Sequence, residues 1–382
     1  MKRIIYVDNF STGIFQEVFN TSSLKMMSTI FEEVVYYTSN SVKKNTYSFY
    51  NEKPVNITHR FIPILNFNNS FGNFIRHLLP IFTSIYVILK SKKSDIIYFN
   101  YNVLWAMPVI NFLSRVLNKK IILMCHGEME YLVNGVNINF LSAYLLRKFK
   151  SNSFEPANNL YFCVIGVHIK KNLVKLLPNK VSRKLVYFNH SHIFKEAPKK
   201  DDLVSTTINV GVVGTVRENK WLSSIMELGN NIKSIPHISF SAVGRVYCKE
   251  AQLVEAGINI VKDSNTRFLS RAEMNHAISK LDYVLFLYPV GSYKYTASGA
   301  LFDAIDNEKQ ILALKNDYFN DVFNYCPELG SLFNNIQELT EFIKELNDSN
   351  KKRIDYENIK NKLSPQSAAK LFKSQLKNNF NI

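Results

Sequence analysis

Short apolar runs alternate with longer amphipathic segments along the first half of the chain. The runs are rich in β-branched and aromatic residues with almost no polar interruption, which is typical of strands in a parallel sheet buried on both faces. They lie at Arg3–Val7, Glu33–Tyr37, Ile96–Asn100, Lys120–Cys125, Leu160–Ile165 and Lys184–Phe188. Helix-length segments lie between them, such as Phe15–Thr29, Phe74–Lys90 and Met107–Leu117. This alternation predicts a doubly wound α/β domain.

A second series of the same kind follows a charged segment, KEAPKKDD, whose proline and charges indicate a linker. Its predicted strands and helices are Ile208–Val213, Ser239–Val243, Asn259–Val261, Tyr283–Tyr288 and Gln310–Ala313, with Trp221–Ser234 and Ala297–Ile305 between them. The tail is helical in pattern, with Ser364 as a cap and Pro365 in the first turn. The predicted organisation is two Rossmann-like domains at 1–193 and 208–360, a linker at 194–207, and a terminal helix at 361–382.

The length and composition agree with this organisation. A chain of 382 residues is long enough for two domains, and 46% hydrophobic with 20% charged residues is typical of a folded globular protein. The 47 Lys and Arg against 31 Asp and Glu give a net charge of +16. Such a charge favours nucleic acid, an anionic lipid surface or phosphate-bearing substrates as partners. A codon bias toward Lys, Asn, Ile, Phe and Tyr is the alternative explanation, and the sequence leaves both open.

The four cysteines are far apart and have no metal-ligand spacing, so we expect buried free thiols in a reducing, cytoplasmic compartment: Cys125, Cys163, Cys248 and Cys326. The first apolar run, Ile4–Val7, ends at Asp8 and indicates a strand rather than a signal peptide. The apolar stretch Phe74–Leu89 is too short and too interrupted to span a bilayer.

The segment Phe71–Lys93 combines apolar residues with basic ones. Such a mixture suits peripheral docking on an anionic membrane, which would give part of the excess positive charge a role. A plain core helix of the N-terminal domain at Phe74–Leu89 is the alternative explanation of the same apolar residues. The sequence leaves both interpretations open.

Two candidate anion sites follow strands of the second domain. In NVGVVGTVRENKW, we predict a loop that opens at Gly214, where the backbone can approach a diphosphate beside Arg217 and Lys220. In LFLYPVGSYKYTASGALFDAI, Ser298 and Gly299 precede a helix whose free amides favour an anion, and Asp303 can accept hydrogen bonds from ribose hydroxyls. Ordinary tight turns with small residues are the alternative at each place.

Two further loops follow strands of the first domain. IILMCHGEMEYL delivers His126, Glu128 and Glu130 after a strand, which supplies hydrogen-bonding groups and a candidate general base. DNFSTGIFQE contains Thr12 and Gly13 in a small-residue loop of the kind that contacts phosphate or sugar, without a full dinucleotide fingerprint. The chain contains no Walker A, HExxH, GxSxG or nucleic-acid motif.

Together these motifs resemble the GT-B glycosyltransferases, especially family 4 and its bacterial polysaccharide relatives. The likeness spans most of the chain. In the first domain the strand ending in His126-Gly127, the segment FCVIGVHIKKNL and the turn at Asn189 match the family pattern, with His190 in place of the usual Gly. The resemblance implies two Rossmann-like domains that face each other across a cleft, with a C-terminal helix that crosses back to the N-terminal domain.

The second-domain motifs match with substitutions. Gly214 and Lys220 keep the family spacing, but Thr215 replaces the usual Arg, so Arg217 would take its role. Of two family glutamates eight positions apart, Asp303 matches the second and Tyr295 stands at the first. That departure leaves the donor sugar and the stereochemical outcome open. GSLFNNIQELTEFIKEL resembles the family's C-terminal Gly-strand-helix unit.

The resemblance implies transfer of a sugar from a nucleotide-diphosphate sugar to a glycan or lipid-linked acceptor, without a metal or other cofactor. The donor side would comprise Gly214, Arg217, Lys220, Tyr295, Ser298, Gly299 and Asp303, and the acceptor side Thr12, Gly13 and Glu130. His126 would contact the donor sugar. For an inverting reaction, Glu128 is favoured as the base over Glu130 and Asp8. A nucleotide-sugar epimerase or hydrolase of the same fold and a non-catalytic glycan-binding protein are the alternatives.

Overall fold

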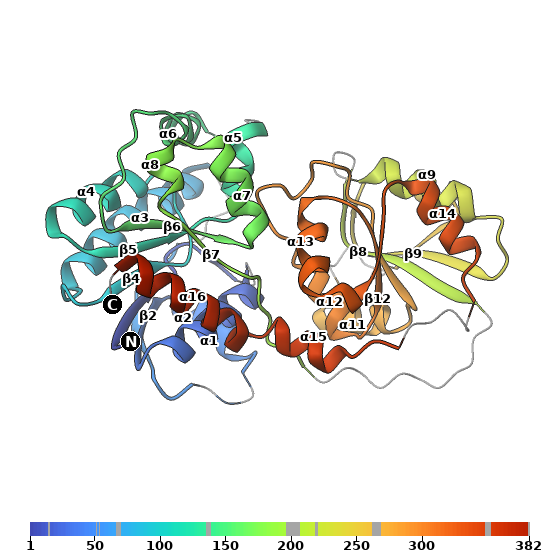
Figure 1. Cartoon of the computed structure of the whole chain (residues 1–382), viewed down its shortest axis with the longest axis horizontal. Coiled ribbons are helices and arrows are strands. Elements are labelled where there is room, and N and C mark those ends of the chain that lie inside the picture. The colour runs from blue at the N-terminus through green and yellow to red at the C-terminus, as the bar shows by residue number, and fades with distance from the viewer. Residues whose placement is uncertain are drawn as a thin grey trace. The chain divides into compact units, whose positions relative to one another are not determined.

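A computed structural model describes residues 1–13, 16–50, 52, 54–65, 70–134, 139–195, 207–217, 221–261, 269–347 and 353–380. The first sheet within these ranges has seven parallel strands in the order β3-β2-β1-β4-β5-β6-β7 (Figure 1). The strands are β1 (Arg3–Val7), β2 (Glu33–Thr38), β3 (Ile57–Phe61), β4 (Ile96–Phe99), β5 (Lys120–Met124), β6 (Leu160–Ile165) and β7 (Leu185–Phe188).

Helices alternate with these strands along the chain, as in a doubly wound domain. They are α1 (Glu17–Ile30), α2 (Asn40–Tyr47), α3 (Ser70–Lys90), α4 (Met107–Leu117), the 3-10 turn η1 (Gly127–Glu130), α5 (Tyr131–Asn134), α6 (Phe140–Lys150), α7 (Val167–Leu176) and α8 (Asn179–Ser182). Ser39 and Asn139 begin α2 and α6 by accepting a backbone hydrogen bond in the first turn, as N-cap residues do.

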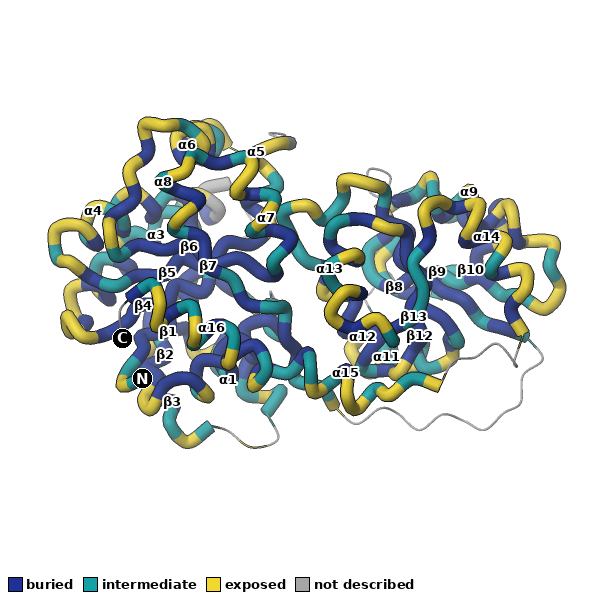
Figure 2. The backbone as a smooth tube through the Cα atoms, in the orientation of Figure 1, coloured by how far each residue is buried: buried dark blue, intermediate teal, exposed yellow. Residues whose placement is uncertain are grey.

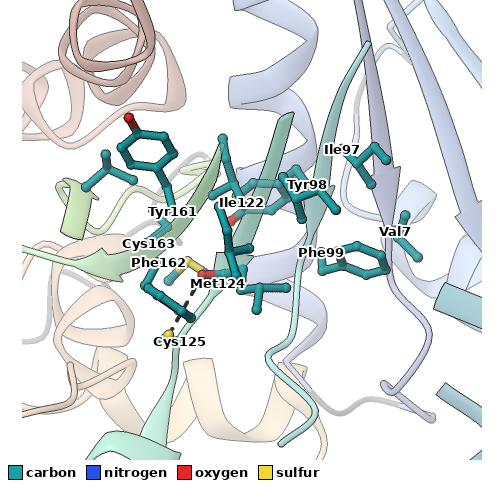
Figure 3. Packing of buried hydrophobic residues seen from close by; sticks show 14 of the residues in the cluster. Val7, Ile97, Tyr98, Phe99, Ile122, Met124, Cys125, Tyr161, Phe162 and Cys163 are labelled. Carbon is teal, nitrogen blue, oxygen red and sulfur yellow. Dashed lines mark hydrogen bonds between the residues drawn. The ribbon is translucent and has the colours of Figure 1, made fainter. Parts of the chain in front are cut away.

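The core of this unit is the sheet itself, because its central strands are buried along their whole length (Figure 2). Figure 3 shows Val7 of β1 beside Phe99 of β4 on one face of the sheet, and Ile122 of β5 beside Tyr98 on the other. Tyr98 stacks on Tyr6 with ring centroids 5.3 Å apart. Burial of so many large apolar side chains at about 25 cal/mol per Å² is the main stabilising contribution, and it holds the polar strand ends in place.

The second sheet has six parallel strands within the described residues, in the order β10-β9-β8-β11-β12-β13. They are β8 (Ile208–Arg217), β9 (Ile238–Tyr247), β10 (Ile258–Val261), β11 (Tyr283–Phe286), β12 (Gln310–Leu314) and β13 (Gly330–Phe333). The helices are α9 (Leu222–Ile232), α10 (Glu250–Glu255), α11 (Arg271–Ser279), α12 (Ala300–Asp306), α13 (Asp317–Tyr325), the 3-10 turn η2 (Pro327–Leu329), α14 (Ile336–Lys344) and α15 (Tyr356–Lys362).

The chain forms two compact units around the two sheets. The first contains Met1–Ile193, Tyr295–Ala297 and the chain from Leu363 onward, and the second contains Phe194–Lys294 and Ser298–Lys362. The last helix, α16 (Pro365–Phe380), therefore belongs to the first unit, where it packs against α1 and β7 (Figure 1). This confirms the predicted return of the C-terminal helix to the N-terminal domain.

Side-chain contacts secure α16 in the first unit. Gln375 accepts a hydrogen bond from the backbone N–H of Tyr187 at 3.1 Å and donates to the carbonyl of the same residue. Ser364 accepts from the backbone N–H of Ser367 at 3.3 Å, so it caps the helix as predicted. The helix begins at Pro365 rather than at the predicted residue 361. Residues 361 and 362 belong instead to the separate helix α15.

Several predicted boundaries were wrong. The strand β3 was missed because only Ile57 of its residues is buried, so the segment lacks the apolar run of the other strands. The strand β8 does not end at Gly214 but continues to Arg217, and its partner β9 continues to Tyr247. The helix α12 begins at Ala300 rather than Ala297. Most of the predicted linker, residues 196–206, lies outside the described residues.

The cysteines are free thiols, as expected, but Cys248 is only half-buried. Within the described part of the chain, no helix is long and apolar enough to cross a membrane.

Candidate functional site

Each sheet has a point where the order of strands reverses. In the first sheet this point lies between β1 and β4, and in the second between β8 and β11. In open parallel sheets, ligands bind beyond the carboxyl ends of the strands at such points. The loops that follow these four strands, with β5 next to β4, are therefore the places to look for a site in each unit.

A buried hydrogen-bonded network lies at this point of the first sheet. Asp8 follows β1, and its Oδ1 accepts from the backbone N–H of Ser11 at 3.0 Å. Asn20 of α1 donates from Nδ2 to Asp8 Oδ2 at 2.9 Å. Asn100, which follows β4, donates from Nδ2 to Asn20 Oδ1 at 2.6 Å. Because Asp8 is fully buried and held by these donors, it lies inside the unit as a structural acceptor, and burial raises the pKa of its carboxyl group.

His126 is joined to this network beyond the end of β5. Its Nε2 lies 2.8 Å from the backbone carbonyl oxygen of Asn100. The ring of Tyr101 stacks on the imidazole, and the ring of Phe19 meets it edge-on at 4.8 Å between centroids. Burial lowers the pKa of His126 to about 4, so the imidazole is neutral at pH 7.

Glu128 lies beside His126 but turns toward the backbone. Its Oε2 accepts from the backbone N–H of His126 at 2.8 Å, inside the turn η1. Burial raises the pKa of Glu128 to about 8, which keeps much of the carboxyl group protonated at pH 7. A general base must be ionised and within reach of its proton. These contacts give Glu128 a positioning role in the turn, and its role as a base stays a prediction.

The predicted acceptor-side residues come from two loops of the first unit, the one after β1 and the one after β5. Thr12 is half-buried and Gly13 is exposed, with its carbonyl accepting from Asn45 Nδ2 at 2.7 Å. Glu130 accepts from the backbone N–H of Tyr295 at 3.2 Å, in the short segment Tyr295–Ala297 that packs with the first unit. Burial raises the pKa of Glu130. Glu130 and Tyr295, predicted for different roles, thus touch within this unit.

In the second unit, a pair of glycines lets two strands approach closely. Gly214 of β8 is in register with Gly244 of β9, and both have positive φ, at 109° and 129°. A Cβ atom on Gly244 would lie 2.3 Å from the carbonyl oxygen of Gly214. Only glycine fits there, which is why β8 continues where the sequence indicated a loop. A Cβ on Gly214 would lie 3.6 Å from the Cβ of Ala300, so β8 passes beside the start of α12.

Beyond these glycines, one face of the paired strands is cationic. Thr215 is in register with Arg245, and Arg217 with Tyr247, so these four side chains share a face while Val216 is buried on the other. The Arg217 guanidinium lies 4.9 Å from the centre of the Tyr247 ring. Arg217 is thus the last residue of a strand rather than part of a loop. Lys220, predicted beside it, lies outside the described residues.

Arg245 and Tyr247 were missed by the sequence reasoning. The signal was present, because the alternation in SAVGRVY continues past the predicted strand end at Val243. The register with β8, which places them beside Arg217, is visible only in the fold.

The helix entry predicted to bind an anion has a buried and an exposed part. The Ser298 hydroxyl lies 3.2 Å from the Tyr288 hydroxyl inside the unit, and the Ser298 carbonyl accepts from Tyr318 at 3.0 Å. Gly299 is exposed, and a Cβ atom there would meet nothing within 4 Å. Ser298 therefore fixes the loop, while Gly299 and the following amides border open space next to Gly214.

Asp303 has a partner that the sequence did not indicate. Its carboxylate pairs with the guanidinium of Arg271 from α11. The Asp303 side chain is 14% exposed. A ribose hydroxyl would have to share the carboxylate with Arg271, so the predicted ribose contact stays a prediction. The described residues contain no group of three or more His, Cys, Asp or Glu side chains placed to hold a metal ion.

Solved structures share the fold of this chain over its full length. HepE from Anabaena, in complex with UDP, matches with a TM-score of 0.61 at 12% identity, covering 100% of both chains. The chain has the GT-B glycosyltransferase fold. Two other GT-B structures cover 100% of this chain and 98% of their own. They are sucrose-phosphate synthase from Thermosynechococcus elongatus, with a TM-score of 0.58 at 12% identity, and the lipopolysaccharide outer core galactosyltransferase WaaB in its apo form, with 0.54 at 11%.

The GT-B likeness is one of structure rather than of sequence. No family model matches the chain. No curated protein matches it either.

Proposed function

We propose that the protein is a glycosyltransferase that moves a hexose from a nucleotide-diphosphate sugar to a glycan or lipid-linked acceptor, in the synthesis of a bacterial surface polysaccharide such as capsule or O-antigen. HepE, with the same fold, has been solved with UDP and with UDP-glucose, and WaaB is a lipopolysaccharide galactosyltransferase. The observation that carries the proposal is in the second unit: a glycine strand with an exposed cationic face passes beside the start of α12.

The second unit would bind the donor diphosphate. As the glycosidic bond breaks, negative charge grows on the leaving nucleoside diphosphate, and fixed cations with backbone amides stabilise it. Arg217 and Arg245 provide cations on one strand face, and the backbone at Gly299 borders the same glycine strand. Lys220 would add a third cation from the segment that follows β8. The proposal requires no metal ion.

The first unit would hold the sugar and the acceptor. His126 presents a neutral imidazole beyond β5, and Thr12 and Gly13 belong to the loop after β1. Neutral hydrogen-bonding groups of this kind suit the hydroxyl groups of sugars.

A nucleotide panel tests the donor assignment. We expect one nucleoside diphosphate to raise the melting temperature of the full chain, because a ligand that binds only the folded state stabilises it. The matching nucleotide sugar should then be consumed only when a glycan or lipid-linked acceptor is added. Consumption without acceptor would instead indicate an epimerase or hydrolase. Absence of a shift with every nucleotide would contradict the proposal and favour a glycan-binding protein.

We also propose that the first unit docks on an anionic membrane surface through α3, where a lipid-linked acceptor would be found. Phe82, Tyr86 and Leu89 are spaced by four and three residues and are exposed on one stripe of the helix, with Phe82 59% and Leu89 60% exposed. The opposite face packs into the unit through Val87 and Ile88. Exposed lysines follow directly at 90, 92 and 93, and such residues attract anionic lipid at about 1 kcal/mol each.

Vesicle co-sedimentation tests this docking. Binding to vesicles containing phosphatidylglycerol should exceed binding to neutral vesicles and should weaken as salt is added. Leu89→Ser should reduce it, whereas Val254→Ser, at an equally exposed apolar residue of α10 in the second unit, should not. Equal binding to both kinds of vesicle, or equal loss in both variants, would contradict the docking surface.

A further inference from the structure

The network between Asp8 and His126 determines which atom of the imidazole is open to a ligand. We propose that Asn100 and Asn20 are positioning residues that hold His126 with its proton on Nε2, so that Nδ1 accepts a hydrogen bond from a substrate hydroxyl group. That this substrate hydroxyl group belongs to a sugar rests on the proposed function. The position of the proton on Nε2 does not rest on it.

The proton follows from the partner of Nε2. A backbone carbonyl only accepts, so at 2.8 Å from the Asn100 carbonyl oxygen the Nε2 atom must donate. A neutral imidazole carries one proton, which leaves Nδ1 as an acceptor. None of the described residues makes a hydrogen bond to Nδ1. The aromatic rings of Tyr101 and Phe19 hold the plane of the imidazole, so a ligand meets a defined lone pair.

The direction of each hydrogen bond in the network is set from the carboxylate outward. Asp8 Oδ1 accepts from the backbone N–H of Ser11, and its Oδ2 accepts from Asn20 Nδ2 at 2.9 Å, so the Asn20 amide turns its nitrogen toward Asp8. Its Oδ1 is then left to accept from Asn100 Nδ2, at 2.6 Å. Asn100 is held at its backbone as well, because its N–H donates to the carbonyl of Val7 at 2.8 Å.

The consequence for the backbone of Asn100 is that its carbonyl has one orientation. Side chain and N–H are both tied to neighbouring elements, and Asp8, Asn20 and Asn100 are each no more than 1% exposed. Water therefore does not compete for these bonds, which strengthens them in a low-dielectric interior. Loss of either asparagine side chain removes one of the two restraints on the peptide that His126 donates to, and leaves only the bond to Val7.

A lone pair at this position selects among ligand groups. A sugar hydroxyl has a proton to donate, whereas an ionised phosphate oxygen has none and would face the lone pair unfavourably. His126 therefore suits the neutral, hydroxyl-bearing part of a nucleotide sugar or its acceptor. The phosphates are left to the cationic strand face of the second unit.

Nitrogen NMR of the full chain, labelled with ¹⁵N-histidine, tests the tautomer without any assay of activity. His126→Gln identifies the signals of His126. We expect the wild type at pH 7 to show a protonated Nε2 and an unprotonated Nδ1. Asn100→Ala and Asn20→Ala should shift His126 toward a mixture of tautomers. Asn56→Ala should leave it unchanged, because Asn56 also holds two backbone carbonyls, those of Ser28 and Phe31, but lies outside the network.

A proton on Nδ1 in the wild type would overturn the proposal, whether or not the variants fold. An unchanged tautomer in folded Asn100→Ala and Asn20→Ala would also overturn it. If the wild type transfers no sugar with any donor, the proposed function fails while the tautomer result still stands.

Kinetics add the link to the substrate. Losing one oriented hydrogen bond corresponds to a fall of about tenfold in kcat. Asn20→Ala should show this fall with the KM for the nucleotide sugar nearly unchanged, and should cause no further fall when combined with His126→Gln. Equal losses in the presence and absence of His126 would mean that Asn20 acts only through the general structure, contrary to the proposal.

Discussion

The points where the strand order reverses carry different kinds of polar group in the two units. In the first unit, Asp8, Asn20, Asn100 and His126 are buried and bonded to one another, and the imidazole is neutral. In the second unit, Arg217 and Arg245 are exposed on a strand face made accessible by two glycines. The first region is arranged by hydrogen-bond direction, and the second by charge and backbone shape.

This difference indicates what each region can recognise. A buried neutral network cannot attract a distant anion, but it presents a donor or acceptor in a fixed direction at little entropic cost. Exposed cations attract anions over about 8 to 10 Å at physiological salt. A nucleotide sugar carries both kinds of group, hydroxyls at one end of the diphosphate and charge at its centre.

Removing the predicted cation after β8 should have the largest effect. In Lys220→Ala, transfer should fall by about 100- to 1,000-fold, because the proposed function assigns this charge to the leaving diphosphate. Circular dichroism should show an unchanged fold. Lys148→Ala, at an exposed lysine of α6, is the control and should retain wild-type turnover. Turnover unchanged in Lys220→Ala would sink the diphosphate assignment.

Adding a methyl group where β8 and β9 approach at Gly214 and Gly244 should lower the stability of the fold. Gly244→Ala should lower the free energy of unfolding by about 2 to 4 kcal/mol, since the new methyl group would collide with the Gly214 carbonyl at a positive φ. Gly299→Ala has open space and should change it by less than about 1 kcal/mol. Urea denaturation of the full chain measures both. Similar values for the two variants would show that the strands are not held at this distance.

Breaking an ion pair should cost more stability in the first unit, where the pair is buried, than in the second, where it is exposed. Arg3 donates to both oxygens of Asp95, which is 2% exposed, and Arg3→Ala should cost about 3 kcal/mol because a buried charge is left without its partner. The pair of Arg271 with Asp303 is more exposed, and Arg271→Ala should cost less than about 1 kcal/mol. A larger cost for Arg271→Ala in thermal or urea unfolding would reverse this ranking.

Acid and base should act oppositely on two neighbouring groups of the first unit. Burial lowers the pKa of His126 to about 4, so its contribution to stability is present above its ordinary value of 6.5 and is lost as pH falls toward 4. Burial raises the pKa of Glu128 to about 8, so its contribution is present below 4.5 and is lost as pH rises through 8. Each slope should approach 1.4 kcal/mol per pH unit, the value for one proton.

The measurement is the difference in unfolding free energy between the wild type and each variant as a function of pH. For His126→Gln the wild-type advantage should shrink on acidification, and for Glu128→Gln it should shrink on alkalinisation. Two slopes of the same sign would contradict the burial of one of these groups.

The sequence predicted the layout of the two sheets well for a simple reason. Strands buried on both faces, such as Leu160–Ile165, must be apolar throughout, and that demand is local. Prediction failed where a strand is not so buried. β3 has exposed side chains, and the far end of β8 is held by a glycine pair whose members are thirty residues apart, Gly214 and Gly244. No local pattern reports such a contact.

The candidate site was predicted in part. His126, Gly214 and Arg217 could be named as candidates because each lies close after, or within, a recognisable apolar strand, and their roles stay predictions. Asn20, Asn100 and Arg245 were missed, since an asparagine or arginine gives no sign of its partner when alignment with a neighbouring strand decides what it meets. Asp303 was identified without its partner Arg271, which comes from another helix.

The sequence by itself determined the alternation of strands and helices, the two-sheet organisation and the cap of the last helix at Ser364. These depend on the burial, capping and turn preferences of residues close together in the chain. Only the tertiary structure decided that Asp8, Asn20 and Asn100 act on His126 as one network, and that Gly244 lets β8 reach past Gly214. Those outcomes depend on strand register and on the direction of hydrogen bonds between segments far apart in sequence, which are settled only when the sheet closes around them.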